Sequence, residues 1–218
     1  MRKTARHARL QWLLTVTAAS MTAGCVSSVV VESNFPAPLI EAMPVRVGVI
    51  IDDSLSDYVY VEDVPQQSTW TIDLGDANVA MFRPLLTSMF KEVEVVDGVP
   101  LPPDQAPLFD GVIKPALEKF EFDVPVGERD EFVEVWMQYR LTLYDPNGNV
   151  VVEWPVSGYG KAELDGGREK VLQRAAIVAM REVGANIATQ FPEQEEVSYW
   201  LSERENAAAL SVQNQPGD

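Results

Sequence analysis

Alternation between apolar and polar residues is strongest in the second half of the chain. Every second residue is apolar over residues 133–143, and the same alternation returns over residues 150–156. A period of two is typical of a strand with one buried face. Residues 145–148 (DPNG), which lie between the two runs, are of types that favour a tight turn. The pattern therefore predicts a long β-hairpin.

A period near 3.6 identifies two longer segments as helices. The first begins at Gly75, with Asp76 as its expected N-cap, and buries one apolar stripe. Pro84 lies inside this stripe, so we expect a kink or a later helix start there. The second helix covers residues 166–190 and is rich in alanine, which permits close approach to a sheet. A shorter helix is predicted over residues 195–209.

The remaining apolar runs are short and rich in β-branched residues, which favours strands. They cover residues 45–51, 58–61, 69–72, 93–96 and 111–122. In the last of them, Pro115 is expected at an edge or a bulge. The order of elements predicts an α+β fold, in which a mixed or antiparallel sheet contains the long hairpin and carries two main helices packed on one face.

The first 25 residues have a different composition. Four basic residues precede a mostly apolar run over residues 10–19, and small residues then lead to Cys25. This order is typical of a bacterial secretory signal, and the apolar run is too short to span a membrane. With Ala23 and Gly24 directly before the cysteine, the segment resembles the precursors of bacterial lipoproteins. Cleavage by an ordinary signal peptidase after Ser20 or Ala23 is the alternative.

Cys25 is the only cysteine of the chain. The resemblance implies that it becomes the mature N-terminus and carries two or three acyl chains, such as palmitate, which anchor the protein stably in a membrane. The next residue is Val26 rather than Asp, which by resemblance to enterobacterial sorting favours the outer membrane, with the body facing the periplasm. The expected organisation is a signal peptide at 1–24, a lipidated N-terminus and tether at 25–43, one periplasmic α+β domain at 44–209 and a disordered tail at 210–218.

Maturation changes the chemistry available to the chain. Removing residues 1–24 takes away four of the 17 basic residues, none of the 33 acidic residues and the only histidine, His7, so the formal charge falls from −16 to −20. A protein this acidic is unsuited to nucleic-acid phosphates. Without an imidazole or a free thiol, Ser-His-Asp and Cys-His catalysis and zinc sites with nitrogen or sulfur ligands are excluded. We therefore expect no cofactor and no enzymatic activity.

Paired carboxylates of the kind used in glycoside hydrolysis occur at three places. These are Asp52-Asp53, Glu118 with Glu121, and the cluster of Glu128, Asp130, Glu131 and Glu134. Because 33 of the 218 residues are acidic, we interpret them as solvated surface charge. Residues 145–149 have the initial spacing of a calcium loop, but the later Gly and Glu of such a loop are missing, so the hairpin turn explains them better.

Two groups of large side chains are candidates for a protein-binding surface. Tyr199, Trp200 and Leu201 lie together in a charged segment near the C-terminus, and Trp70 lies in an early strand or loop. Aromatic residues of this kind often anchor a protein partner. Such residues more often dock onto their own domain, and the burial of Trp200 distinguishes the two interpretations.

From residue 44 to 190, the predicted order of elements resembles small envelope-assembly lipoproteins. These are the auxiliary lipoproteins of ABC-type lipid transporters, the lipopolysaccharide-assembly lipoprotein and the TolB-N-like domain of curli-secretion lipoproteins. The resemblance implies a non-catalytic binding or assembly partner of an envelope complex. A lipid-binding transport module, which needs an apolar cavity between sheet and helices, is the first alternative. A glycan-active enzyme that uses only carboxylates is the second.

Overall fold

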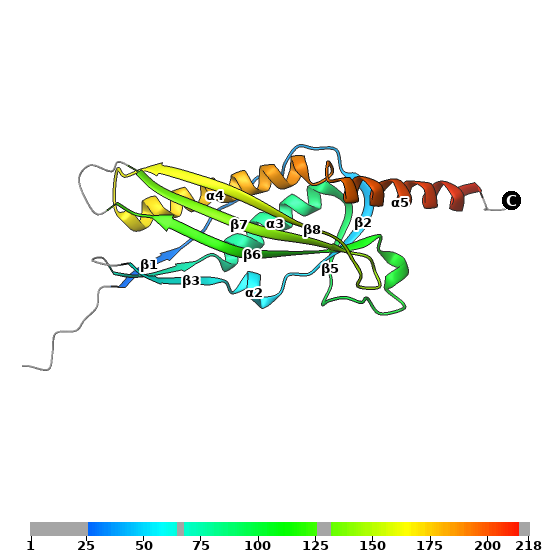
Figure 1. The fold of residues 1–218 in the computed structure, drawn as a ribbon, viewed down its shortest axis with the longest axis horizontal. Coiled ribbons are helices and arrows are strands. Elements are labelled where there is room, and N and C mark those ends of the chain that lie inside the picture. Colours follow the sequence, from blue (N-terminus) through cyan, green and yellow to red (C-terminus); the bar gives the residue numbers. More distant parts are fainter. Residues whose placement is uncertain (1–25, 65–67, 126–131, 214–218) are drawn as a thin grey trace, which may run out of the picture.

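The computed structural model describes residues 26–64, 68–125 and 132–213, and its larger sheet has five strands in the order β5-β2-β6-β7-β8 (Figure 1). The strands are β2 (Met43–Val49), β5 (Phe90–Val95), β6 (Gly111–Asp123), β7 (Phe132–Tyr144) and β8 (Val150–Glu163). β2 runs parallel to β5 and β6, whereas β6, β7 and β8 are antiparallel to one another. The mixed sheet and the α+β class are as predicted.

The β7–β8 hairpin is the predicted one, and Asp145 organises its turn. The Asp145 carboxylate accepts hydrogen bonds from the backbone N–H groups of Asn147 and Asn149, at 2.9 and 2.8 Å. It also accepts one from the Asn149 side chain at 2.8 Å. Gly148 has a φ of +90°, which an L side chain rarely adopts. Turn geometry therefore accounts for the spacing that resembled a calcium loop.

Two helices cover one face of this sheet, as predicted. They are α3 (Gly75–Met89) and α4 (Arg168–Gln190). The ring of Phe82 in α3 lies 5.4 Å from that of Tyr139 in β7. On the neighbouring strand, a Cβ at Gly160 would lie only 1.9 Å from the carbonyl oxygen of Ala175, so the glycine lets the α4 backbone touch β8. The glycines at 158 and 160 thus serve helix–sheet packing.

The start of α3 differs from the prediction in one respect. Asp76 was expected to cap the helix, but the cap position is Leu74 and no side chain caps it there. Instead, the Asp73 carboxylate accepts a hydrogen bond from the Gly75 N–H at 3.1 Å. The helix continues through Pro84 to Met89 without ending.

A second, three-stranded sheet has the order β1-β4-β3, with β1 parallel and β3 antiparallel to β4. Its strands are β1 (Val26–Val30), β3 (Val59–Asp63) and β4 (Thr69–Asp73). The inner face packs on the end of β6: Tyr60 lies 5.0 Å from Phe120, and Trp70 lies 5.6 Å from Phe122, between ring centroids. This small sheet therefore lies on the same side of the large sheet as the helices.

The prediction of a tether over residues 25–43 is wrong for residues 26–31. Residues 26–30 form β1, and Val29 and Val31 are buried in the core. Phe35 is also buried, and residues 35–38 border a hollow between α3 and α4. The serine and proline content suggested a linker, but residues 26–30 pair with β4, about forty residues later in the chain, whereas residues 31–42 form no helix or strand.

The last helix, α5 (Glu195–Gln213), is longer than the predicted segment and includes residues assigned to the tail. In Figure 1 it extends beyond the sheets at one end of the elongated molecule, whereas β1 and β3 lie at the other end. Short helical turns, α2 (Asp53–Ser56) and η1 (Ala106–Leu108), complete the described elements. Within the described ranges, no helix combines the length and the apolar character that membrane crossing requires.

Candidate partner-binding surface

The four predicted surface residues do not form one surface. Trp70 belongs to β4 of the small sheet, and its side chain is only 1% exposed because it packs against Phe122. The residues Tyr199, Trp200 and Leu201 lie in α5, at the opposite end of the molecule (Figure 1). Trp70 is therefore a core residue, and the candidate surface reduces to the start of α5.

Trp200 is also buried, and it fixes the position of α5. Its side chain is 2% exposed, and its indole N–H donates a hydrogen bond to the Asp110 carbonyl oxygen at 3.3 Å. A Cβ at Gly111 would lie 3.0 Å from the Trp200 ring, so the glycine makes room for it. Val197, one turn earlier, is fully buried. The tryptophan thus docks onto its own domain, and Leu201 beside it is half-buried against the same core.

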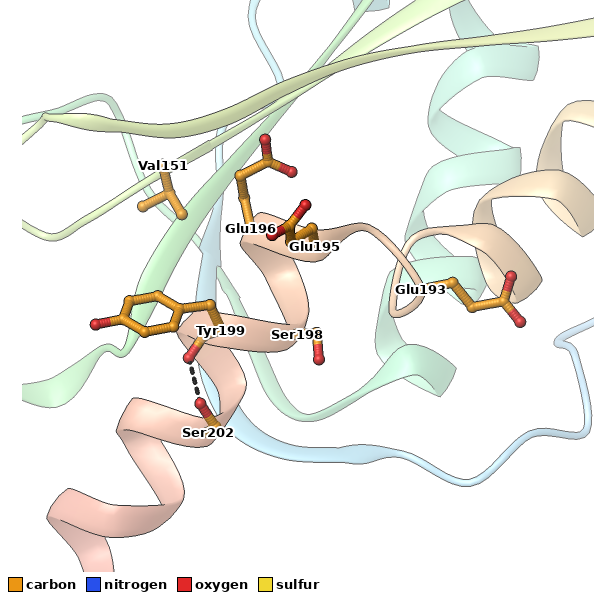
Figure 2. Close-up of a pocket in the computed structure, with 7 residues that line it drawn as sticks. All are labelled: Val151, Glu193, Glu195, Glu196, Ser198, Tyr199 and Ser202. Carbon is orange, nitrogen blue, oxygen red and sulfur yellow. Dashed lines mark hydrogen bonds between the residues drawn. The ribbon is translucent and has the colours of Figure 1, made fainter.

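Tyr199 has the opposite orientation and is 65% exposed. Its ring borders an open groove of about 800 Å³ between the start of α5 and the first residues of β8 (Figure 2). The groove is lined by Val151, Glu193, Glu195, Glu196, Ser198, Tyr199 and Ser202. We call this feature the α5 groove.

Carboxylates dominate the electrostatics of the α5 groove. Three of its seven lining residues are glutamates, and among the described residues none of the three has an ion-pair partner. The Tyr199 hydroxyl donates a hydrogen bond to Glu203 at 3.0 Å, and this bond raises the pKa of the tyrosine. The groove therefore combines an aromatic ring and an aliphatic side chain with uncompensated negative charge.

Sequence reasoning found Tyr199 but missed the rest of the α5 groove. The acidic residues between Pro192 and Val197 were visible as a charged segment, but nothing indicated that they would face β8. Val151 was predicted only as part of the hairpin. The contact between α5 and the β8 edge depends on the chain reversal after α4, and that reversal is fixed by tertiary packing of Phe191 against Phe90 and Trp154.

Three of the carboxylates considered for acid–base chemistry take part in ion pairs. Lys114 lies 2.7 Å from Asp52, and this contact, followed by the hydrogen bond from Ser54, lowers the pKa of Asp52. Hydrogen bonds from Tyr159 and Lys161 lower the pKa of Glu134. Glu118 pairs with Arg140. A carboxyl group with a lowered pKa is ionised at neutral pH, so it is unsuited to donate a proton.

Three of the other acidic candidates, Glu128, Asp130 and Glu131, lie outside the described residues. Cys25 also lies outside them, one residue before β1. Within the described ranges, no group of three or more His, Cys, Asp or Glu side chains is arranged to hold a metal ion.

The apolar hollows against the helices are small. One, of about 240 Å³, lies between α3 and the strands β2 and β5. The other, of about 280 Å³, lies between α3, α4 and residues 35–38. Pockets for small molecules usually have volumes of about 300 to 1,000 Å³. Neither hollow is large enough to favour the lipid-binding alternative.

No protein-family model matches the chain, and no curated protein matches it. Its fold has structural neighbours among solved bacterial proteins. A DUF330 protein from Xanthomonas campestris has a TM-score of 0.48 and 11% identity, over 85% of this chain and 99% of that one. A hemagglutinin homolog from Helicobacter pylori has a TM-score of 0.48 and 10% identity, over 78% and 96% of the two chains.

A protein from Caulobacter crescentus that is classed as a lipoprotein has a TM-score of 0.34 and 11% identity, over 56% of this chain and 78% of that one. All three TM-scores are below 0.5, so no family membership and no function is transferred from these neighbours.

Proposed function

We propose that this chain is a lipoprotein of the outer membrane that binds another envelope protein without catalysing a reaction. Acyl chains on Cys25 would hold the acidic α+β domain in the periplasm. The observation that carries the proposal is the N-terminal sequence, in which a basic segment, a short apolar run and small residues end at the only cysteine.

The fold supports anchoring at one end and binding at the other. β1 begins at Val26, directly after Cys25, so the anchor is attached to the domain without a flexible linker. The α5 groove lies at the opposite end of the molecule (Figure 1). An anchored domain is confined near the membrane, which raises its effective concentration for a partner in the same compartment. The α5 groove would thus lie at the end of the domain remote from the anchor.

The chemistry of the α5 groove favours a partner segment that carries lysine or arginine. Unpaired carboxylates attract cations, and Tyr199 offers an exposed aromatic ring, of the kind that contributes strongly to protein interfaces. The carboxyl groups with shifted pKa values, Asp52, Glu134, Asp145 and Asp165, are all shifted downward within the described chain. These four carboxyl groups are therefore ionised at neutral pH and are unsuited to donate a proton.

Anchoring is tested by mass spectrometry of the N-terminal peptide after expression in a diderm bacterium. We expect Cys25 to carry a diacylglyceryl group and the protein to fractionate with the outer membrane. The Cys25→Ser variant should appear in the soluble fraction with its domain folded. An unmodified Cys25 in the exported protein would refute the proposal.

Binding is tested by placing a photo-crosslinking amino acid at position 199 in the lipidated protein. The matched control places it at Ser157, an exposed residue of β8 that lies outside the α5 groove. We expect a discrete crosslinked product from position 199 in intact cells and a much weaker one from position 157. Equal products from both positions, or none from position 199, would contradict a partner site in the α5 groove.

A further inference from the structure

The outer face of the small sheet carries four exposed valines. Val26, Val30, Val59 and Val61 are 67%, 50%, 48% and 61% exposed. The strand registers place them on one side, because Val30 and Val59 both pair with Asp73 and Val61 pairs with Thr71. Trp70 and Ile72, which alternate with these β4 positions, are buried on the other side. We call these four side chains the valine face.

The valine face is compact. The distance from Val26 to Val30 along β1 is about 13 Å, since a strand rises about 3.3 Å per residue. Val30 and Val59 are separated by one intervening strand, which is about 10 Å at the usual spacing. The four exposed valines therefore form a patch in which every member lies within about 20 Å of Val26.

The position of Cys25 identifies what covers this patch. Consecutive Cα atoms are about 3.8 Å apart, so an acylated Cys25 would place Val26 at the membrane surface. No flexible segment intervenes that could let the small sheet move away, since Val29 and Val31 are fixed in the core. We propose, on the basis of the lipid anchor proposed above, that the valine face rests on the phospholipid surface and fixes the orientation of the domain.

The charges on this side of the molecule define the kind of contact. Besides the four valines, the outward positions of the small sheet are Ser28, Thr69, Thr71, Asp63 and Asp73, and they include no lysine or arginine. Asp63 accepts a hydrogen bond from the Thr69 hydroxyl, and Asp73 accepts one from the Gly75 N–H. Contact with the membrane is therefore apolar and does not depend on anionic lipid headgroups.

The open face of the large sheet, on the opposite side of the molecule, is charged rather than aliphatic. The face of the large sheet that the helices leave open carries ion pairs, among them Glu134 with Lys161 at 3.0 Å and Arg140 with Glu118 and Glu153. These charged groups favour water. The two broad sides of the domain thus differ in polarity, and the aliphatic one adjoins the anchor.

The test uses the acylated mature protein in phosphatidylcholine vesicles, with one fluorophore per molecule. Because Cys25 is the only native cysteine and is blocked by acylation, Val61→Cys introduces a unique labelling site. Ser157→Cys, on the open face of the large sheet, is the matched control. We expect a lipid with a quencher in its headgroup to quench the label at position 61 at least about threefold more than the label at position 157, since apolar faces insert into the headgroup region.

A second variant separates contact from simple proximity. Replacing Val26, Val30 and Val59 by threonine keeps the β-branched side chains that strands prefer but adds hydroxyl groups. Quenching at position 61 should then fall toward the control value, while circular dichroism confirms that the protein remains folded. In the labelled Val61→Cys protein without the threonine replacements, quenching should persist at high salt.

Three results would overturn the inference. Equal quenching at positions 61 and 157 in protein that floats with the vesicles excludes membrane contact and leaves the proposed lipoprotein function intact. Efficient crosslinking between the thiols at position 61 of two unlabelled molecules, together with no lipid quenching of the label at that position, assigns the valine face to a second copy of the chain. An unacylated Cys25 overturns both this inference and the proposed function.

Discussion

At the scale of single residues, the close contact between β8 and α4 depends on two glycines. A Cβ at Gly158 would lie 2.3 Å from the Ala179 carbonyl oxygen, and one at Gly160 would lie 1.9 Å from that of Ala175. Both contacts involve backbone atoms, so a side chain could be accommodated only by moving the helix. The sequence predicted that α4 approaches a sheet closely, but the strand that it touches became known only from the structure.

We predict that Gly160→Ala lowers the free energy of unfolding by about 2 to 4 kcal/mol, because the methyl group overpacks the β8–α4 contact. Gly184→Ala, in α4, is the control: outside the helix's own backbone and the two chain neighbours, no atom lies within 4 Å of its added Cβ. That substitution should raise stability by up to about 1 kcal/mol, since alanine is the better helix former. Both substitutions are made in the Cys25→Ser protein, and urea unfolding measures the free energy of unfolding of each variant. Similar free energies for the two variants would contradict this packing.

A buried hydrogen-bond chain connects three elements of the core. The Tyr139 hydroxyl donates to the Asn78 side-chain oxygen at 2.6 Å, and the Asn78 amide donates to the Leu55 carbonyl oxygen at 3.0 Å. Both side chains are fully buried. Burial raises the pKa of Tyr139 above its ordinary value of 10, because the phenolate form would lose its hydration.

This shift predicts a loss of stability at alkaline pH. Above pH 10 the unfolded chain releases the Tyr139 proton while the folded protein retains it, so the unfolded state binds fewer protons and stability falls as pH rises. The contribution is at most about 1.4 kcal/mol per pH unit. Burial, followed by the hydrogen bond with Glu62, raises the pKa of Tyr60 to about 12, which adds to the same trend.

In Tyr139→Phe we expect stability to decrease less steeply with alkaline pH. At neutral pH this variant should be about 1 to 3 kcal/mol less stable than the parent, because the Asn78 oxygen loses its donor. Urea unfolding at pH 8 and pH 11 provides the comparison. Parallel losses of stability in the two proteins would show that Tyr139 does not cause the pH dependence.

At the scale of elements, the helices and the hairpin could be predicted because their periodicity is local. β7, β8, α3 and α4 each contain enough alternating or repeating apolar residues to identify them without any partner. β1 could not be found in this way. It has two serines among its five residues, and its pairing partner β4 lies about forty residues later in the chain.

The same limit applies to the candidate site. Tyr199 and Trp200 are adjacent in the sequence and were candidates for one partner surface, yet one is exposed and the other buried. Neighbouring residues in a helix point about 100° apart, so a helix that packs on only one side separates them. Which of the two faces inward is decided by the space above Gly111, and that space is a tertiary property.

Deletion of residues 26–31 tests the role of β1 as a structural strand. Val29 and Val31 are buried, and β1 completes the hydrogen bonding of one side of β4. We expect the deletion in a soluble form to lower the free energy of unfolding by about 3 kcal/mol or more, at about 1.5 to 3 kcal/mol for each buried aliphatic side chain. Amide exchange should increase along β4. An unchanged melting temperature would instead support a tether.

At the scale of the whole molecule, β1 and the start of α5 occupy opposite ends of an elongated domain (Figure 1). Residues 25–218 carry a formal charge of −20, and the glutamates of the groove add a local concentration of this charge. Association with a basic partner segment would therefore be accelerated by long-range attraction and weakened by salt.

We predict that the photo-crosslink from position 199 decreases several-fold when the salt concentration is raised from about 50 to 500 mM in isolated envelopes, because screening shortens the range of the attraction. Glu195→Gln with Glu196→Gln should produce a similar loss at low salt. The control is Glu153→Gln, an exposed carboxylate of β8 that does not line the groove. Crosslinking that is insensitive to both salt and the paired substitution would argue for a neutral partner surface.

The junction between Cys25 and β1 also imposes an order on biogenesis. Enzymes that acylate this cysteine and cut before it need an extended, uncovered backbone, which the chain no longer offers once Val26 pairs with Thr69. Under the proposed lipoprotein function, β1 is therefore inserted into the small sheet only after processing. Until that moment the edge of β4 is open to pairing with other chains. A precursor whose processing is delayed is therefore expected to depend on a periplasmic chaperone, whereas the finished lipoprotein is not.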